Sequence, residues 1–251
     1  MPSSRLTILD EPDLARDSLP VSETFVSIQG EGKLAGVPSW FLRTSGCNLR
    51  CTWCDTPYAS WSPEGTRRTL TDLIAEAKGA KVGHAVLTGG EPMLFAALVP
   101  LTHALRDAGI HITIETAGTL APTPLPHCDL WSISPKLAHS TPRNDPRDAT
   151  GAWAARHEQR RLNVPALQSL LNAPGDHQLK FVVSNERDLA EIDDLLSKLT
   201  SWAPSDILLM PEGITTPTPA QRAAVADVCL SRGFRYCARL HIELFGNTRG
   251  T

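Results

Sequence analysis

Short apolar runs alternate with longer amphipathic stretches along most of the chain, and this alternation predicts strands followed by helices. The apolar runs expected to form strands are residues 23–32, 39–46, 84–92, 110–119, 129–136, 176–184, 205–213 and 235–244. Apolar positions at helical spacing predict helices over residues 70–80, 96–109, 186–199 and 218–233. Thr71 is the expected N-cap of the first helix, and Gly109 is the expected end of the second, with Pro100 near its first turn. Repeated strand–helix units imply a parallel sheet with right-handed crossovers.

Four of the predicted strands end in short polar motifs that carry glycine or proline. The motifs are TGGEP, ETAGT, SPK and PEG, which begin at Thr88, Glu115, Ser134 and Pro211. In parallel α/β folds, ligands bind at the carboxyl ends of the strands. We therefore expect the four motifs to line one shared pocket.

The chain is interpreted as one domain over residues 21–251, preceded by a loose arm over residues 1–20. With 251 residues, of which 41% are hydrophobic, it is long enough to bury one sizeable core. The polar and irregular segment 138–163 interrupts the strand–helix alternation. We interpret that segment as an insertion or a mobile loop.

Charge and hydropathy argue against two classes of partner. The formal net charge is −3, so nothing indicates binding to nucleic-acid phosphates, and no apolar run is long enough to cross a bilayer. The first residues lack the apolar core of a secretory signal and carry several acids, which predicts a cytoplasmic protein. Thiols stay reduced in that compartment, so clustered cysteines indicate metal or redox chemistry before structural disulfides.

Three cysteines, Cys47, Cys51 and Cys54, lie within eight residues in a C-x3-C-x2-C pattern. The other cysteines are isolated, and Cys229 falls within a helical pattern, where it is expected to be a small buried apolar residue. A structural zinc site takes four protein ligands, whereas three ligands leave one position open for chemistry. Thiolates favour zinc, copper or iron–sulfur, and this tight loop could ligate three corners of a cubane cluster. The alternatives are a zinc site with a distant fourth ligand and chance clustering.

The cysteine spacing resembles that of the radical S-adenosylmethionine (SAM) enzymes, and TGGEP resembles the GGE motif of that superfamily. Trp53 also stands where members commonly carry an aromatic residue. SIQGEG at residues 27–32 and GVPSWFLRTSGCNLRCTWCDT at residues 36–56 resemble the 7-carboxy-7-deazaguanine synthase family of queuosine and 7-deazapurine biosynthesis. The resemblance runs from about Glu23 to Lys136, with weaker similarity near the C-terminus.

That resemblance implies an incomplete (β/α) barrel, open on one side, and a homodimer. It also implies a [4Fe–4S] cluster, SAM and Mg²⁺ as cofactors, and an electron donor such as flavodoxin or ferredoxin. In the family, one electron from the cluster cleaves SAM, and the resulting 5′-deoxyadenosyl radical abstracts hydrogen from C6 of 6-carboxy-5,6,7,8-tetrahydropterin. The ring then contracts to 7-carboxy-7-deazaguanine, ammonia leaves, and return of the hydrogen allows SAM to be reused.

Residues receive roles from the resemblance only where they match the family's motifs. Cluster ligation is expected of Cys47, Cys51 and Cys54, and Mg²⁺ ligation of Thr56. SAM binding is expected of Trp53, Cys54, Asp55, Gly90, Glu91, Ser134, Pro135 and Lys136. Substrate contacts are expected of Ile28, Gln29, Gly30, Arg43, Thr88, Glu115 and His241.

Several of these residues also have a structural interpretation. Thr56 suits an ordinary turn, and Ile28–Gly30 suits a simple glycine turn. A guanidinium at the end of a strand suits a bidentate clamp on the pterin carboxylate, but Arg43 could instead pair with a local acid such as Glu31. His241, expected on the last strand, could be a hydrogen-bonded core histidine.

Two other functional classes share part of the pattern. A radical SAM activase of a glycyl-radical enzyme would share the cysteine motif and GGEP, but not the Q-G-E-G turn or C-D-T. A zinc-binding module without enzymatic activity would need a fourth ligand.

Overall fold

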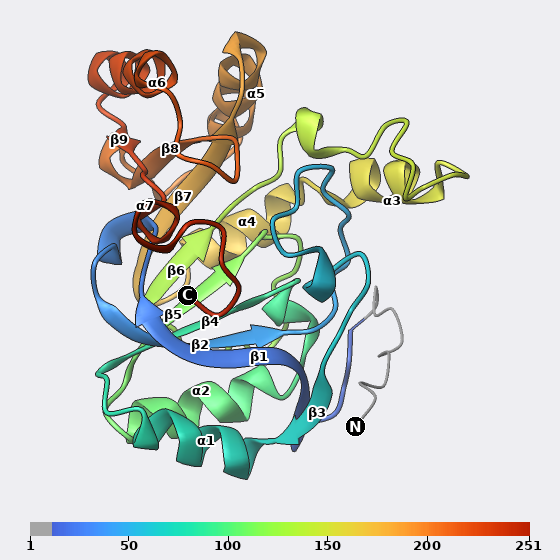
Figure 1. Cartoon of the computed structure of the whole chain (residues 1–251), viewed down its shortest axis with the longest axis vertical. Helices are drawn as coiled ribbons and strands as arrows, with labels where there is room; N and C mark the ends of the chain where they lie inside the picture. Colours follow the sequence, from blue (N-terminus) through green and yellow to red (C-terminus); the bar gives the residue numbers. More distant parts are fainter. Residues whose placement is uncertain (1–11) are drawn as a thin grey trace.

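The computed structural model describes residues 12–251, which form a curved sheet flanked by helices (Figure 1). Within that range the sheet has nine strands in the order β3-β1-β2-β4-β5-β6-β7-β8-β9. The strands are β1 Ser18–Ile28, β2 Pro38–Thr44, β3 Thr66–Thr69, β4 His84–Gly89, β5 His111–Thr116, β6 Leu130–Ile133, β7 Asp176–Val183, β8 Ile207–Pro211 and β9 Arg235–Tyr236. The helices are α1 Leu70–Gly79, α2 Leu98–Asp107, α3 Ala152–Arg160, α4 Val164–Leu171, α5 Glu186–Ser197, α6 Pro219–Arg232 and α7 Leu240–Phe245.

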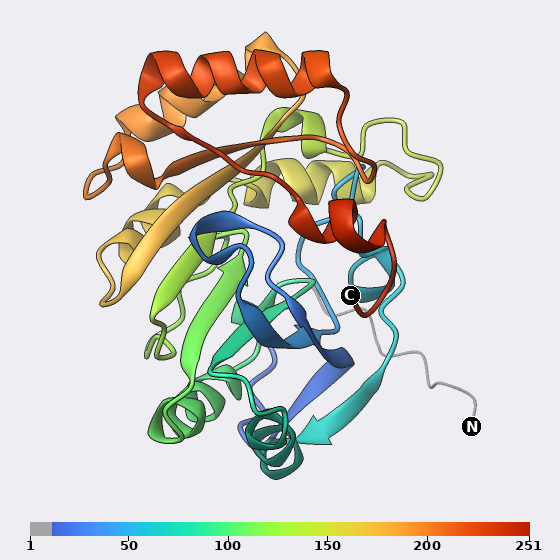
Figure 2. The ribbon, with the colours of Figure 1, turned by 60° about the vertical axis from the view of Figure 1, so that its left-hand side comes forward.

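The sheet is an open partial barrel, as the sequence predicts. Strands β2 and β4 to β9 are parallel, while β1 pairs antiparallel with both β2 and β3. Strands β3 and β9 stand at opposite ends of the order, so the sheet does not close on itself. Helices α1, α2, α5 and α6 lie outside the curve, whereas α7 and the end of the chain lie inside it (Figure 2).

The core lies between the sheet and the outer helices. Trp40, Leu87, Trp131 and Phe181, from four different strands, are each at most 1% exposed. Burying an apolar side chain of this size contributes about 1.5–3 kcal/mol. Both indole N–H groups are satisfied, because Trp131 donates to the carbonyl of Pro174 at 3.0 Å and Trp40 donates to a carboxylate of α1.

The helix termini follow capping rules, with one correction. Thr69 caps α1 by accepting a hydrogen bond from the Asp72 N–H at 3.2 Å, so the predicted N-cap at Thr71 is wrong. Gly109 follows α2 with a φ of 73°, and Pro100 lies in the first turn of α2, as predicted. Within the described residues, no helix has the length and apolar character needed to span a membrane.

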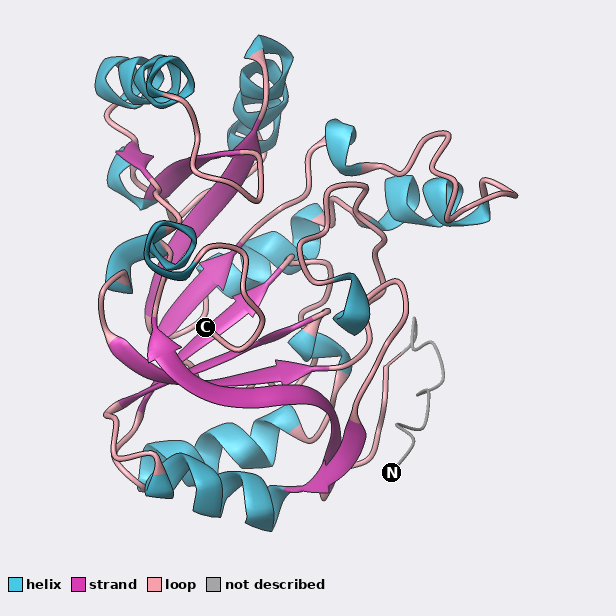
Figure 3. Cartoon of the chain, viewed as in Figure 1, coloured by secondary structure: helices cyan, strands magenta, loops and turns pink. Residues whose placement is uncertain are grey.

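Three stretches differ from the expectations. Residues 1–11 of the predicted arm lie outside the described residues, and residues 18–20 already belong to β1. Segment 138–163, predicted to be an insertion or mobile loop, contains α3 and packs against the rest of the fold. The predicted last strand over 235–244 shrinks to two residues, and its second half forms α7. Figure 3 also shows β3 and α4, neither of which the sequence pattern indicated.

Candidate functional site

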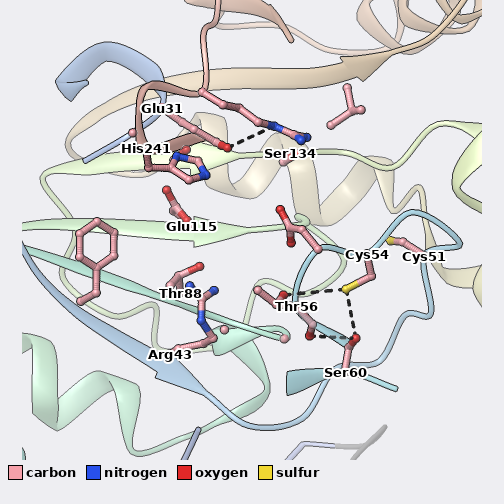
Figure 4. A pocket seen from close by; sticks show the side chains of 18 of the residues that line it. Glu31, Arg43, Cys51, Cys54, Thr56, Ser60, Thr88, Glu115, Ser134 and His241 are labelled. Atoms are coloured by element: carbon pink, nitrogen blue, oxygen red, sulfur yellow. Dashed lines mark hydrogen bonds and ion pairs between the residues drawn. The ribbon is translucent and has the colours of Figure 1, made fainter. Parts of the chain in front are cut away.

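A cavity of about 310 Å³ lies on the inner side of the sheet, at the carboxyl ends of the parallel strands (Figure 4). Thr88, Glu115 and Ser134 bring the motifs TGGEP, ETAGT and SPK to its wall. The fourth motif, PEG, does not line the cavity, because Glu212 lies beside His139, with carboxylate oxygen and ring nitrogen 3.4 Å apart. Three of the four predicted strand ends therefore share one pocket.

Almost every residue assigned from the sequence lines this cavity, from Ile28 to His241. The two exceptions are Glu91 and Pro135. The close-up in Figure 4 shows that the side chains come from separate strands, the cysteine loop and α7 and face the same space.

The cysteine loop supplies three free thiols to the cavity wall. Cys47 and Cys51 are buried, and Cys54 is partly exposed. Burial raises the pKa of Cys47 to about 12 and also raises the pKa of Cys51, so their thiolates need a positive partner such as a metal.

The arrangement of these thiols fits a cluster. Among the residues that the structure describes, no three His, Cys, Asp or Glu side chains converge closely enough to hold one metal ion. A cluster does not need such convergence, because each thiolate binds a different iron. Three thiols on one cavity wall, two of them buried, are therefore a donor set that suits an iron–sulfur cluster.

Segment 138–163 fastens the backbone of the cysteine loop. His157, fully buried, accepts the Arg50 N–H at its Nδ1 over 3.1 Å, and its Nε2 lies 2.9 Å from Ser140 Oγ. The carbonyl of Ser140 accepts the Thr52 N–H at 2.9 Å. Burial lowers the pKa of His157 to about 4, which keeps Nδ1 an acceptor at neutral pH. The predicted mobile loop is thus a packed support of the cysteine loop.

Glu91 lies behind the cavity wall, at 0% exposure. Its carboxylate accepts the N–H groups of Met93 and Ala117 at 3.0 and 2.9 Å and the hydroxyl of Thr116 at 2.7 Å. These bonds tie the loop after β4 to the end of β5. The Glu91 oxygens bond to these neighbouring groups and do not line the cavity, and the expected contact of Glu91 with the SAM ammonium stays a prediction.

Trp53, Ser134 and Lys136, which are expected to bind SAM, lie together on one side of the cavity. Lys136 Nζ donates to the carbonyl and hydroxyl oxygens of Ser134, both at 2.8 Å, and lies 5.8 Å from the centre of the Trp53 ring. Trp53 Nε1 is buried without a hydrogen-bond partner among the described residues. A cavity-lining indole N–H of this kind suits a bound polar ligand. Nearby, the hydroxyl of Thr56 lies 3.8 Å from Cys54 Sγ.

Arg43 enters the cavity from β2 and is held by Glu23 of β1. Arg43 Nε donates to Glu23 Oε1 at 2.7 Å, and the Tyr58 hydroxyl donates to the same oxygen at 2.9 Å. Burial would raise the pKa of Glu23, but the charge and hydrogen bond of Arg43, with hydrogen bonds from Arg249 and Tyr58, together lower it. Arg43 therefore does form a salt bridge with a local acid, but the acid is Glu23 and not the suggested Glu31.

Glu31 belongs to a second charged group on the same wall. It forms an ion pair with Lys180 of β7, and its Oε1 lies 3.6 Å from Arg239 Nε. Burial would raise the pKa of Glu31, but the charges of Lys180, Arg239 and His241 and the hydrogen bond from Lys180 together lower it to about 2. Glu31 is therefore ionised at neutral pH. Lys180 and Arg239 also line the cavity and were not assigned from the sequence. A lysine inside the apolar run QLKFVV does indicate a charged residue at a buried site.

The Q-G-E-G turn packs directly against α7. The Leu240 N–H donates to the carbonyl of Gly30 at 2.9 Å, and a Cβ on Gly30 would stand 1.9 Å from His241 Nδ1. Gln29 from the same turn donates to Glu115 Oε1 at 3.2 Å. His241 is partly exposed at the cavity on a helix, so both its predicted strand position and the core-histidine alternative are wrong.

Other lining residues were not assigned from the sequence. They include Phe25, Phe41, Leu49, Tyr58, Ser60, Gly89, Thr116, Ala117, Ser132, Val182 and Met210, together with residues 247–251. The last five residues carry no periodicity or motif that would have placed them at the cavity. Their position depends on α7, which the sequence pattern did not indicate.

Comparisons with known proteins agree with this geometry. The radical SAM superfamily pattern matches residues 41–129. A 7-carboxy-7-deazaguanine synthase from Rhodopirellula baltica is 48% identical over 240 residues, covering 94% of this chain and 90% of that protein. The Halobacterium salinarum protein of the same name is 45% identical over 244 residues, covering 93% of each chain.

A solved structure shows the same architecture. The crystal structure of QueE from Escherichia coli matches with a TM-score of 0.65 at 27% identity. The match covers 89% of this chain and 95% of the other. The similarity in fold therefore extends over nearly the whole length of both proteins.

Proposed function

This chain belongs to the 7-carboxy-7-deazaguanine synthase family of radical SAM enzymes, and from that premise we propose how its own residues serve the reaction. The enzyme converts 6-carboxy-5,6,7,8-tetrahydropterin to 7-carboxy-7-deazaguanine with a [4Fe–4S] cluster, SAM and Mg²⁺. When bound and reduced, the cluster and SAM supply the radical that takes hydrogen from C6 of the substrate.

The cofactor side of the cavity is assigned to the cysteine loop and two strand ends. Cys47, Cys51 and Cys54 hold the cluster, and the loop keeps its shape through contacts with segment 138–163. Trp53 and Ser134 contact SAM. Pro135, which does not line the cavity, sets the path of the backbone after β6, as Glu91 does after β4.

The substrate side is assigned to residues that can hold a carboxylate and a flat polar ring. Arg43, aimed by Glu23, grips the pterin carboxylate. The neutral hydroxyl of Thr56 would be one ligand of Mg²⁺, and the substrate carboxylate and water would supply the other oxygens that this ion prefers. The turn at Gln29 and the carboxylate of Glu115, already hydrogen bonded to each other, meet the polar edge of the ring.

We also propose an electron donor for the enzyme and a homodimeric assembly. The enzyme needs a reductant, and we assign this role to a flavodoxin or a ferredoxin in the cytoplasm. A homodimer is supported by the outer edge of β1 beyond Val21, where β3 ends and Val26 is 51% exposed. Phe245 on α7 adds a further exposed apolar side chain, at 43%.

The observation that carries the proposal is that the three cysteines, the strand-end motifs and the Arg43 clamp line one cavity. To test it, anaerobically reconstituted enzyme is incubated with 6-carboxytetrahydropterin, SAM and dithionite, and the products are analysed by mass spectrometry. We expect 7-carboxy-7-deazaguanine in excess over 5′-deoxyadenosine, because SAM is reused. Reductive SAM cleavage without any ring-contracted product would contradict the substrate assignment and favour the activase alternative.

A further inference from the structure

The segment 247–251 crosses from α7 toward the loop that follows the cysteines, and it lines the site cavity (Figures 1 and 2). It has no regular secondary structure, although Thr248 Oγ1 donates to the carbonyl of Phe245 at 2.7 Å and Thr251 Oγ1 donates to the carbonyl of Thr248 at 2.8 Å. These bonds are local to the segment. Its attachment to the opposite rim of the cavity runs through Arg249.

Arg249 makes four contacts on that rim, of which the weakest is a hydrogen bond from Nη2 to Ser22 Oγ at 3.5 Å. Its Nε donates to Glu23 Oε2 at 3.0 Å, and its Nη1 donates to Glu64 Oε2 at 3.0 Å. Its guanidinium lies over the Tyr58 ring, 3.9 Å from the centre. A planar guanidinium can bridge two carboxylates while stacking on an aromatic ring, which a lysine ammonium cannot do. The contacts use the geometry that distinguishes arginine from lysine.

The Glu23 carboxylate joins this contact to the substrate clamp. One of its oxygens holds Arg249, and the other holds Arg43 and the hydroxyl of Tyr58. Glu23 is 13% exposed, so it is a partly buried junction between the segment and the residue assigned to the substrate carboxylate. A displacement of Arg249 removes one of the two cations that orient this carboxylate.

We propose that Arg249 is a positioning residue, which latches segment 247–251 across the cavity and, through Glu23, keeps Arg43 aimed at the substrate. The inference rests on the proposed function for the identity of the ligand that Arg43 grips. The latch is reversible, because the Arg249 side chain is 45% exposed and exposed ion pairs are weak and screened by salt. Substrate enters when the latch is open and is held when it closes.

The test compares Arg249→Gln with a matched control in the reconstituted enzyme. Arg232 on α6 has the same two kinds of contact, an ion pair with Asp193 and a ring contact with Phe234 at 5.9 Å, but lies away from the cavity. Arg249→Gln should raise the KM for the pterin by about tenfold, which corresponds to ~1.4 kcal/mol, with little change in kcat. Arg232→Gln should leave KM, kcat and SAM binding at the parent values.

Two further measurements separate a latch from general loss of structure. The KM of the parent should rise with salt, and this dependence should be weaker in Arg249→Gln, because the screened ion pairs are gone. Glu64→Gln, which touches neither Glu23 nor Arg43, should raise KM in the same direction, and Arg249→Lys should restore part of the loss. Parent KM and parent salt dependence in Arg249→Gln would overturn the proposal.

Hydrogen–deuterium exchange tests, independently of the substrate, whether Arg249 holds segment 247–251 in place. Exchange over residues 240–251 should accelerate in Arg249→Gln and stay at the parent rate in Arg232→Gln. Unchanged exchange in Arg249→Gln would overturn the latch even if the parent makes product. A parent that makes no 7-carboxy-7-deazaguanine contradicts the proposed function, and the exchange result then still tells whether Arg249 fastens the segment.

Discussion

Replacing Arg43 by lysine tests the substrate clamp most directly, because it keeps the positive charge and removes the planar fork. In the parent, Nε is occupied by Glu23 at 2.7 Å, and among the described residues no other hydrogen bond engages the guanidinium. One guanidinium can thus bind Glu23 through Nε and a substrate carboxylate through its terminal nitrogens. A lysine ammonium at that position can satisfy one of the two carboxylates well, but not both.

The size of the effect follows from the contact that is lost. A hydrogen bond to a charged group contributes about 1.5–3 kcal/mol. Losing one such bond to the substrate carboxylate in Arg43→Lys should raise the pterin KM by ~10-fold to ~150-fold. If the substrate is also misplaced by about 1 Å, kcat should fall by a factor on the order of a hundred. SAM binding should survive, because Arg43 does not touch the Trp53 side of the cavity.

The assay measures three quantities in each variant: SAM affinity, reductive SAM cleavage without substrate, and formation of 7-carboxy-7-deazaguanine. Arg43→Lys should retain the first two and lose most of the third. Glu23→Gln keeps Arg43 in place but weakens its orientation, so it should shift KM in the same direction by a smaller factor. Parent KM and kcat in Arg43→Lys would show that the substrate carboxylate is bound elsewhere.

Three further predictions concern the cluster, the magnesium ion and pH. Cys51→Ala should lose iron and turnover, whereas Cys229→Ala, buried in α6, should keep the parent iron content and visible absorption. Thr56→Ala should weaken the dependence of rate on Mg²⁺, measured by titrating the metal. Burial, and then the charge of His111, lowers the pKa of His84 to about 4. The stabilising contribution of neutral His84 is therefore complete above about pH 6.5 and is lost as pH falls toward 4. His84 should therefore contribute about 2 kcal/mol to the drop in the free energy of unfolding in urea from pH 7 to pH 5, and His84→Gln should reduce the drop by that amount.

Much of the fold could be predicted because its buried parallel strands are continuous apolar runs. The run from Ile207 to Pro211, with the sequence ILLMP, is one example, since all five residues are buried and such a strand leaves a signal in the sequence alone. Strand β3, with the sequence TRRT, has no such signal and is extended because it pairs with residues 18–21 of β1. LHIEL alternates like a strand, but the Leu240 N–H bonds to Gly30 instead of a neighbouring strand, and α7 forms there.

The candidate site also contains residues that the sequence predicts and others that it does not. Cys47, Thr88 and Ser134 could be placed from the sequence because each belongs to a local motif at the end of a strand. The partner of Arg43 could not, because Glu23 faces it only through the antiparallel register of β1 and β2. Nothing in the sequence shows that register, so the sequence does not distinguish Glu23 from Glu31 as the partner of Arg43.

Segment 138–163 shows why an irregular, polar stretch can still be essential to a cofactor site. None of its residues lines the cavity, yet His157 and Ser140 bind the backbone on either side of Cys51. The cysteine loop has no helix or strand to satisfy its own backbone groups, so its N–H and C=O groups need partners from elsewhere. Burial of a polar side chain such as His157 follows from that need and not from hydrophobicity, which is why the segment left no periodic signal. The position of the thiols therefore depends on residues about a hundred positions away in sequence, since Arg50 and His157 are 107 residues apart.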